Sequence, residues 1–420
     1  MATAFRRGRL MPEREQKPQI RFKGFSDVWE QNKVSDVIED YIEKTVAQNQ
    51  YPVLTSSQQQ GIVLQSEYFA DRQVTTNNNV GYYVLPKGYF TYRSRSDTDI
   101  FVFNRNNIID KGIISYYYPV FKSKNSDSNF LLRRLNYGIK RQLSMAAEGT
   151  GQKVLAHNKF KTIQINIPKY QEQIKIGTLF EHIDSLITLY QRKYEKLKNV
   201  KKSMLEKMFP KNKNKNPEIR FKGFSAPWEE HKLSSVATMH ARIGWQNLRT
   251  SEFLDSGNYY LITGTDFIDG KIDLKTCHFV EKERYDQDKN IQIKNGSILI
   301  TKDGTLGKVA YVEGLDKPAT LNAGVFNVVI IDKNMENKYL FQYLKAPFLM
   351  DYVVKRATGG TIKHLNQNIL VDFPVIHPSY EEQTKIGVFF SKLDDLIALH
   401  QRKLKMLQNI KKSCLEKMFV

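Results

Sequence analysis

The stretch YQEQIKIGTLFEHIDSLITLYQRKYEKLKNVKKSMLEKMF (170–209) has a counterpart at 380–419, YEEQTKIGVFFSKLDDLIALHQRKLKMLQNIKKSCLEKMF, and the two agree at 24 of 40 positions. A second pair, PQIRFKGFSDVWEQNKVSDV (18–37) and PEIRFKGFSAPWEEHKLSSV (217–236), agrees at 13 of 20. The chain of 420 residues therefore contains an internal repeat. Each copy is large enough to be a whole domain with its own core.

Both long stretches predict helices, because their apolar residues alternate in steps of three and four. At 1.5 Å per residue, each helix would be roughly 50–57 Å long. A flanking stripe, with Phe180 and Phe390 at its start, widens the apolar face. Ser379 and Glu382 have the spacing of a capping box before the second helix. The predicted coiled-coil positions are Ile183, Leu186, Tyr190, Leu197, Val200 and Met204 in the first copy, and Leu393, Leu396, His400, Leu407, Ile410 and Cys414 in the second.

The connectivity predicts the direction in which these helices pair. The first helix ends near Phe209 and leads through PKNKNKNP (210–217) directly into the second globular region. The second helix starts from that region, so a paired arrangement has to be antiparallel. We expect an α+β fold in which two globular regions lie at opposite ends of the helix pair, related by a pseudo-two-fold axis.

Composition narrows the class of partner. The chain carries 64 Lys and Arg against 44 Asp and Glu, a formal net charge of +20, which favours a polyanion such as nucleic acid. A Lys-rich surface that serves only solubility is the alternative. The sequence predicts no bilayer-spanning stretch. Only Cys277 and Cys414 are present, without CxxC spacing, which favours a reducing, cytoplasmic setting and no metal site.

The repeat is uneven along its length. The two pairs of matching stretches quoted above form a frame that is nearly constant. By contrast, residues about 38–165 and 237–375 share a predicted pattern of strands and helices but few identical residues. This division is what a protein needs if it holds two identical partners and recognises two different targets.

These features resemble the specificity subunits of Type I restriction-modification systems. The resemblance rests on the two IRFKGFSxxW motifs, the two YxEQxKIG…QRK…KKSxLEKMF helices and the two unlike domains before those helices. It implies that each unlike domain is a target recognition domain that reads one half of a bipartite, asymmetric site in double-stranded DNA. It also implies that the helices form an antiparallel coiled coil, which sets the spacer and docks two methyltransferase subunits.

The same resemblance implies a chain without catalytic activity. Adenine methylation would come from the methyltransferase partner, and cleavage from a motor-nuclease (restriction) subunit. S-adenosylmethionine, ATP and Mg²⁺ would belong to those partners, with no cofactor in this chain. The implied organisation is a tail (1–17), recognition domain 1 (18–168), helix 1 (169–210), a linker (211–217), recognition domain 2 (218–378) and helix 2 (379–420).

The residues themselves offer little support for catalysis. TKDGTLGKVAY (301–311) fails the phosphate-loop pattern, which needs Gly at Lys302 and Ser or Thr at Val309. The sequence lacks an Asn/Asp-Pro-Pro-aromatic motif, and its histidines lack zinc spacing. A self-sufficient DNA methyltransferase or nuclease, and a scaffold that binds only proteins, remain the alternatives to a specificity subunit.

Candidate DNA-contacting residues are polar side chains that gather near predicted loops. Amides suit adenine edges, guanidinium groups suit guanine or phosphate, and lysines suit phosphate. The candidates in the first domain are Ser56, Ser57, Gln58, Gln59, Arg93, Arg95 and Lys153; those in the second are Thr265, Lys302, Thr305, Lys308, Asn322, Lys363 and His364.

Overall fold

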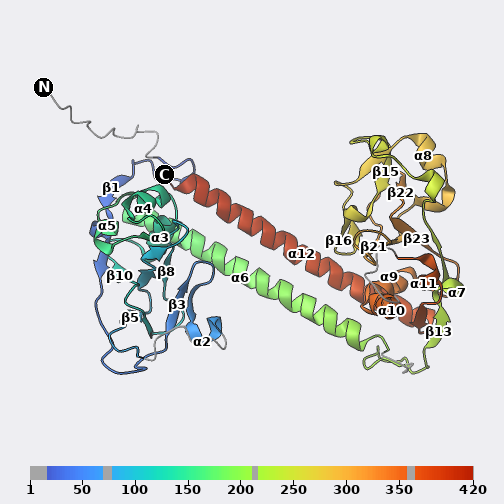
Figure 1. Ribbon diagram of the computed structural model, residues 1–420, viewed down its shortest axis with the longest axis horizontal. Helices are drawn as coiled ribbons and strands as arrows, with labels where there is room; N and C mark the ends of the chain where they lie inside the picture. The colour runs from blue at the N-terminus through green and yellow to red at the C-terminus, as the bar shows by residue number, and fades with distance from the viewer. Residues whose placement is uncertain (1–16, 70–77, 211–215, 357–364, 420) are drawn as a thin grey trace. The chain divides into compact units, whose positions relative to one another are not determined.

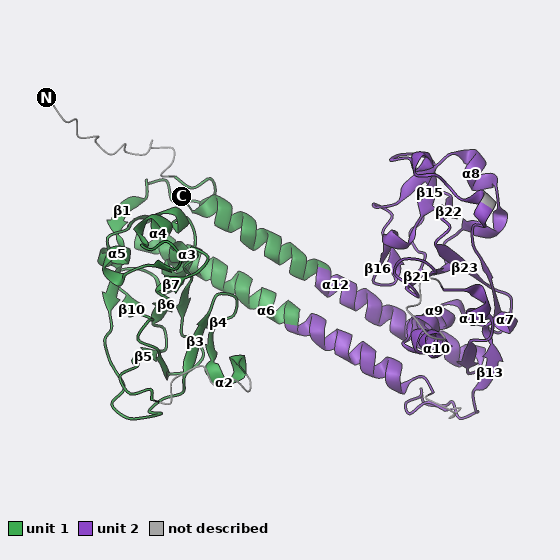
Figure 2. Cartoon of the chain, in the orientation of Figure 1, with its two compact units in different colours: residues 1–191, 402–420 green, residues 192–401 purple. Residues whose placement is uncertain are grey.

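The computed structural model describes residues 17–69, 78–210, 216–356 and 365–419 (Figure 1). The chain divides into two compact units (Figure 2): unit 1 comprises Met1–Gln191 with Arg402–Val420, and unit 2 comprises Arg192–Gln401. Each compact unit therefore contains one globular region and parts of both long helices. In the division predicted from the sequence, each recognition domain ends where its long helix begins. The predicted tail and linker lie almost entirely outside the described residues.

Two long helices, α6 (Tyr170–Lys207) and α12 (Tyr380–Met418), have 38 and 39 residues. In unit 1, Phe180 of α6 packs against Phe419, and Asp184 lies 2.7 Å from Lys411 of α12. As the residue number rises along α6, that of its partner falls. The same holds in unit 2, where Lys201 pairs with Asp394 and Phe209 stacks on Phe390. The predicted antiparallel pairing is thus confirmed in each unit.

The buried face of the helices differs from the predicted seam at some positions. Leu186, Leu396 and Ile410 are 42, 44 and 42% exposed, so their placement in the seam was wrong. The stripe that includes Phe180 and Phe390 is buried or half-buried instead. The predicted seam was misplaced because Lys201 occupies one position of the buried face. A search for apolar residues alone does not assign a lysine to that face. The other predicted positions are buried or half-buried, namely Ile183, Tyr190, Leu197, Val200, Met204, Leu393, His400, Leu407 and Cys414.

Unit 1 contains one four-stranded sheet and several two-stranded ribbons. The sheet has the order β2-β10-β6-β8 and antiparallel pairing. Its strands are β2 (Ile38–Asp40), β10 (Val120–Ser123), β6 (Phe90–Tyr92) and β8 (Phe103–Arg105). The ribbons are β1 (Glu30–Lys33) with β12 (Gln164–Ile167), β3 (Leu54–Ser57) with β4 (Gly61–Leu64), β5 (Tyr83–Pro86) with β9 (Lys111–Ile114), and β7 (Arg95–Ser96) with β11 (Lys153–Val154). Its short helices are α1 (Val34–Val37), α2 (Gln65–Tyr68), α3 (Ser128–Asn136), α4 (Lys140–Ala146) and α5 (His157–Lys161).

Unit 2 has a larger main sheet than unit 1. The two globular regions therefore have the same frame but sheets of different topology. Its six-stranded sheet has the order β14-β23-β20-β21-β17-β16, formed by β14 (Ala237–His240), β23 (Val325–Ile330), β20 (Ile298–Thr301), β21 (Val309–Tyr311), β17 (Lys271–Ile272) and β16 (Phe267–Ile268). A four-stranded sheet contains β18 (His278–Val280), β15 (Tyr259–Ile262), β22 (Ala319–Leu321) and β19 (Gln292–Ile293), and β13 (Glu229–Lys232) pairs with β24 (Pro374–His377). The α-helices are α7 (Leu233–Val236), α8 (Lys282–Asp286), α9 (Asn337–Lys345), α10 (Phe348–Arg356) and α11 (Gln367–Val371), and the 3-10 helices are η2 (Gly244–Gln246), η3 (Thr250–Glu252), η4 (Gly264–Asp266) and η5 (Lys289–Ile291).

The repeated IRFKGFS segment forms a clasp on the start of each long helix. Arg21 Nε and Nη2 donate to the two carboxylate oxygens of Glu172, at 2.9 and 2.6 Å. Arg220 makes the same pair of bonds to Glu382, at 3.0 and 2.6 Å. Both carboxylates are almost fully buried. The structure thus commits Glu382 to Arg220, an interaction that the capping-box interpretation with Ser379 did not anticipate.

Each clasp also receives the end of the other long helix. In unit 1, Ile20 N donates to Lys417 O at 3.0 Å, and Trp29 packs against Phe419 with ring centroids 6.1 Å apart. In unit 2, Ile219 N donates to Lys207 O at 3.0 Å, and Trp228 lies against Phe209. The nearly constant letters of the frame therefore encode one structural junction, built twice.

Candidate nucleic-acid interface

A polar cleft in unit 1 brings together six of the predicted residues. The β3–β4 hairpin supplies one wall, with Ser56, Ser57, Gln58 and Gln59. Arg93, just before β7, and Arg95, the first residue of β7, also line the cleft. The volume of the cleft is about 370 Å³. Carboxamide, hydroxyl and guanidinium groups thus line one opening, although their segments are more than thirty residues apart in the sequence.

Arg95 is held by an aromatic ring. Its guanidinium carbon lies 4.5 Å from the ring centroid of Tyr117, a cation–π contact that restricts the exposed side chain. Arg93 lies 4.0 Å from Asp97, at the limit of an ion pair. Lys153 is opposite Ser96 in the β7–β11 ribbon, next to the arginine wall. Two cations near the cleft and a third beside it can meet phosphate or guanine.

The hydroxyl of Ser57 braces the loop, and that of Ser56 is bonded to the neighbouring sheet. Ser57 is buried, and its Oγ accepts from the backbone N–H groups of Gln59 and Gln60 at 3.3 and 3.2 Å. Ser56 Oγ accepts from Asn104 Nδ2 at 2.8 Å. The prediction of direct DNA contact is therefore wrong for Ser57. Gln58 and Gln59 remain exposed at the tip.

The residues of the cleft that escaped the sequence prediction include Asn104, Tyr68 and Tyr118. Burial raises the pKa of Tyr118, so its hydroxyl stays protonated. Asn104 lies in the three-residue strand β8 between Phe103 and Arg105, a setting that gives no sequence signal. The two tyrosines lie in aromatic segments that read equally well as core.

In unit 2, three loops converge on the turn between β20 and β21. The residue Gly264 lies so close to this turn that a Cβ there would stand 3.3 Å from Thr301 Cγ2. Gly324 approaches Asp303 in the same way, with 3.6 Å to its Cβ. The loops that carry Thr265, Lys302 and Asn322 are therefore neighbours, a proximity that the sequence analysis did not specify.

The turn itself is braced from inside. Thr301 Oγ1 accepts from Lys308 N at 3.0 Å and donates to Thr305 O. Gly307 has a φ of +69°, and a Cβ there would lie 2.0 Å from Met350 Sδ, so glycine is favoured at this position. Thr305 and Lys308 are exposed on this turn.

Lys302 and Asn322 are half-buried, whereas Thr265 is exposed. Lys302 is half-buried with its ammonium 5.5 Å from the centroid of the Phe326 ring, and Asn322 Oδ1 accepts from Ala323 N at 2.8 Å. Thr265 Oγ1 lies 2.6 Å from Thr263 Oγ1. Lys363 and His364 lie outside the described residues.

The comparisons with known proteins find one family domain twice in the chain. The family described as "Type I restriction modification DNA specificity domain" matches residues 15–199 and again residues 226–409. The chain belongs to this family. Each copy of the specificity domain contains one of the two loop clusters described above.

Similar proteins span most of the chain. The Type I restriction enzyme MjaVIII specificity subunit of Methanocaldococcus jannaschii is 23% identical over 311 residues, 72% of either chain. The EcoBI specificity subunit of Escherichia coli is 22% identical over 376 residues, 83% of this chain and 78% of the relative. The crystal structure of a Type I restriction-modification S subunit from M. genitalium covers 96% of this chain and 99% of its own, with a TM-score of 0.61 at 13% identity. That likeness shows the fold.

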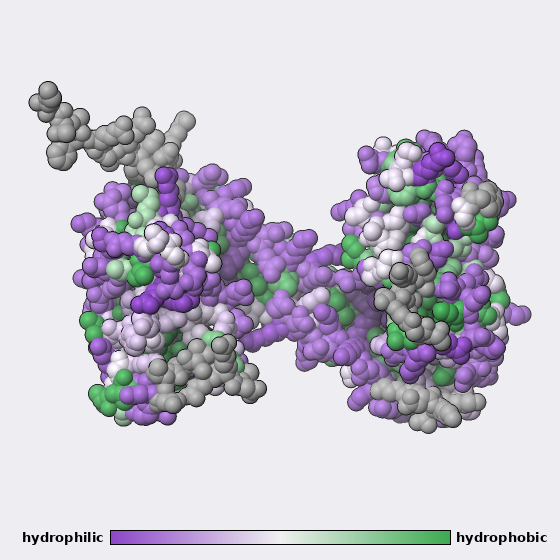
Figure 3. All heavy atoms as spheres, viewed as in Figure 1, coloured by the Kyte–Doolittle hydropathy of each residue, from purple (hydrophilic) through white to green (hydrophobic). Residues whose placement is uncertain are grey.

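The visible face of this specificity-domain chain is largely polar (Figure 3). Figure 3 shows hydrophilic residues over most of the visible face of each unit. No helix among the described residues is both long and apolar enough to cross a membrane. Exposed leucines do recur on the long helices, at Leu186 and Leu189 of α6 and at the equivalent Leu396 and Leu399 of α12, each 42 to 44% exposed.

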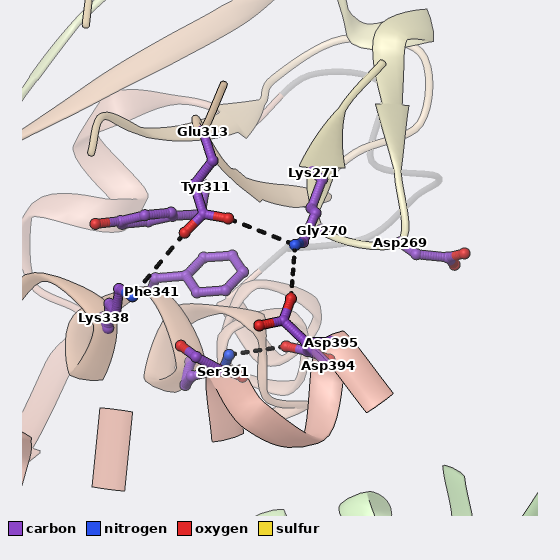
Figure 4. Close-up of a pocket in the computed structure, with 11 residues that line it drawn as sticks. Asp269, Gly270, Lys271, Tyr311, Glu313, Lys338, Phe341, Ser391, Asp394 and Asp395 are labelled. Atoms are coloured by element: carbon purple, nitrogen blue, oxygen red, sulfur yellow. Dashed lines mark hydrogen bonds and ion pairs between the residues drawn. The ribbon is translucent and has the colours of Figure 1, made fainter. Parts of the chain in front are cut away.

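A charged junction joins the globular part of unit 2 to its helices (Figure 4). Lys271 Nζ lies between Glu313 and Asp395, at 3.4 and 3.0 Å. Next to it, Asp394 accepts from Gln342 Nε2 at 2.9 Å and pairs with Lys201. These contacts link β17, the segment after β21, α9 and both long helices.

The pKa values of Lys345 and Asp394 at this junction are both lowered, for different reasons. Burial of Lys345, reinforced by the nearby charge of Lys201, lowers its pKa to about 8. Burial alone would raise the pKa of Asp394, but the charges of Lys345 and Lys201 outweigh it and lower the pKa. Asp394 thus stays ionised while it holds two cations.

Proposed function

We propose that the chain is a non-catalytic DNA-specificity subunit of a Type I restriction-modification complex. Each recognition domain reads one half of a bipartite, asymmetric DNA site, while the paired helices set the spacer and dock two methyltransferase subunits. Methylation, cleavage and the cofactors S-adenosylmethionine, ATP and Mg²⁺ belong to the methyltransferase and restriction partners. The cytoplasm is the expected location.

One observation carries the proposal: a frame built twice presents two unlike polar loop clusters. In unit 1 the cluster holds glutamines and arginines around a cleft, and in unit 2 it holds threonines and lysines on a turn. Identical frames favour identical partners, and unlike clusters favour unlike targets. The net charge of +20 supports a polyanionic target.

The repeated exposed leucines support the docking part of the proposal. Leu186 and Leu396 occupy equivalent positions in the repeat and have nearly equal exposed fractions. An apolar side chain presented twice in the same setting suits two copies of one partner, because the same surface can contact the same subunit twice.

The test uses the full chain in complex with its methyltransferase subunits. Methylation rates are measured on DNA that carries the bipartite site, on DNA with either half scrambled, and on DNA with both halves scrambled. We expect methylation only when both halves are present. Equal rates on all four substrates would contradict the proposal.

Two alanine variants assign the halves. One changes Gln58, Gln59, Arg93 and Arg95, and the other changes Thr265, Lys302, Lys308 and Asn322. We expect the first to relax discrimination in one half-site and the second to relax it in the other, by about 1–3 kcal/mol for each lost base contact. The chain alone, incubated with S-adenosylmethionine and Mg²⁺, tests the alternative of a self-sufficient enzyme.

A further inference from the structure

The β3–β4 hairpin of unit 1 is a short, internally braced ribbon. Its strands pair from Leu54 opposite Leu64 to Ser57 opposite Gly61, so that three glutamines, 58–60, form the connection. Gly61 has a φ of +76°, which closes this tight turn. Because the Ser57 hydroxyl accepts from two backbone N–H groups of the connection, the tip has a defined shape.

The base of the ribbon is fixed in the core. Leu54 is 2% exposed, and a Cβ on Gly112 of β9 would lie 2.4 Å from Leu54 Cδ1. The backbone continues this attachment, because Ile113 N donates to Pro52 O at 2.9 Å. A two-stranded ribbon anchored at its base and polar at its tip has the form of an element that enters the major groove of DNA.

Asn104 holds the ribbon just below the tip. It lies in β8, the edge strand of the four-stranded sheet, and its Nδ2 donates to Ser56 Oγ at 2.8 Å and to Ser57 O at 2.9 Å. One carboxamide thus ties the sheet to the two residues that precede Gln58. Tyr68 adds a weaker contact, 3.4 Å from its hydroxyl to Ser57 Oγ.

The tip carries the chemistry that recognises adenine. Gln58 and Gln59 are exposed, and a glutamine carboxamide can accept from N6 and donate to N7 of adenine at once. The arginines across the cleft add positive charge, and Tyr117 restrains Arg95. The hairpin can therefore approach the duplex with its tip in the major groove, while the arginines across the cleft lie near the phosphate backbone of the DNA.

We propose that this hairpin reads an A·T base pair through Gln58 and Gln59 in the major groove, and that Asn104 is the positioning residue that sets where the tip stands. Asn104 contacts the hairpin and does not itself contact the base. This inference rests on the proposed function, since it names the base pair and the supporting residue of one half-site.

The experiment uses the full complex with methyltransferase subunits. Methylation rates are measured on every single-base substitution of both half-sites, for the wild-type chain, Asn104→Ala and the double variant Q58A/Q59A. We expect both variants to lose about 10-fold or more of the discrimination at one and the same A·T position. The other half-site is the internal control and should keep its wild-type profile.

Asn106→Ala is the matched control for stability. Asn106 is fully buried, and its Nδ2 donates to Leu85 O and Ile109 O, both at 2.9 Å, without contacting the hairpin. We expect this variant to lower the unfolding free energy without changing base preference at any position. The exposed glutamines can be changed without loss of the fold, so Q58A/Q59A keeps the test decisive even if Asn104→Ala fails to fold.

The outcomes separate this inference from the proposed function. If the wild-type complex shows no preference for a bipartite site, both are overturned. If it shows that preference but Q58A/Q59A keeps full discrimination, or relaxes a G·C position, only the hairpin inference is overturned. The role of Asn104 is overturned if its alanine variant folds and discriminates like wild type, or relaxes both half-sites equally.

Discussion

Lys201 Nζ lies 2.5 Å from Asp394 Oδ1, although Lys201 occupies the otherwise apolar face of α6. The repeat builds the same pair in unit 1, where Lys411 Nζ lies 2.7 Å from Asp184 Oδ1. Each aspartate also contacts a helix of its own globular region, through Arg133 of α3 in unit 1 and through Gln342 of α9 in unit 2. In each unit, one carboxylate therefore links three helices. The residue that the globular region contributes differs, being an arginine in unit 1 and a glutamine in unit 2.

The Asp394→Leu substitution should destabilise unit 2 strongly. It removes the partner of Lys201 and leaves Lys345 without its nearest carboxylate, and breaking a buried pair in this way costs about 3–5 kcal/mol. Urea denaturation measures the loss, with fluorescence of the buried Trp228 as the reporter and the other two tryptophans replaced by phenylalanine. Asp395→Asn is the control, because Asp395 is exposed in its pair with Lys271 and should cost at most about 0.5 kcal/mol. Equal effects of the two substitutions would contradict a buried junction.

The clasp makes a parallel prediction for unit 1. Arg21→Met leaves the buried carboxylate of Glu172 unpaired and should cost about 3–5 kcal/mol of unfolding free energy. Arg21→Lys should recover only part of this loss, because an ammonium cannot reproduce the two parallel bonds. Trp29 fluorescence during urea denaturation reports on this clasp. Lys169→Met removes an exposed ion pair with Asp27 and serves as the control, with an expected change of at most about 0.5 kcal/mol.

These two junctions show what sequence reasoning could reach. The repeat, the helices and their antiparallel direction could be predicted, because heptad spacing and connectivity are readable from letters alone. The role of Lys201 could not, since a lysine counts as polar until its aspartate partner on another helix is known. Arg21 and Glu172 are 151 residues apart, so their pairing is a property of the tertiary fold.

The candidate site shows the same division. The amide and arginine clusters near Gln58 and Arg95 were recognisable because both segments are rich in side chains that suit bases and phosphate. Their meeting around one cleft depends on strand pairing that the letters do not specify. Ser57 was misjudged because a hydroxyl that braces a turn and a hydroxyl that faces a ligand look identical in sequence.

The lowered pKa of Lys345 predicts a pH dependence of stability. Its pKa is about 8 in the folded chain, against an ordinary value of 10.5. Between these values the unfolded chain keeps a proton that the folded chain has released, so the contribution of Lys345 to the unfolding free energy rises with pH. Below about pH 8 both states hold the proton, and the contribution is constant.

Lys345→Met isolates this effect. Urea denaturation of wild type and variant from pH 7.5 to 10 should show wild type gaining stability relative to the variant as the pH rises. A difference that is constant, or that shrinks over this range, would contradict the burial of a charged amine at the junction. Lys338→Met is a suitable comparison, because Lys338 is more exposed and lies 4.0 Å from Glu313.

The exposed leucines predict the stoichiometry of the complex proposed above. Leu186→Glu should remove one of two methyltransferase subunits, since a carboxylate on an apolar docking face has to be desolvated on binding. Leu396→Glu should remove the other, and the double variant should bind neither. The folded chain should be unaffected, because both side chains are exposed in the free protein.

Native mass spectrometry counts the bound subunits. Thr188→Glu adds the same charge about 200° around the helix and should leave two subunits bound. Retention of both subunits by the double leucine variant would show that docking uses another surface.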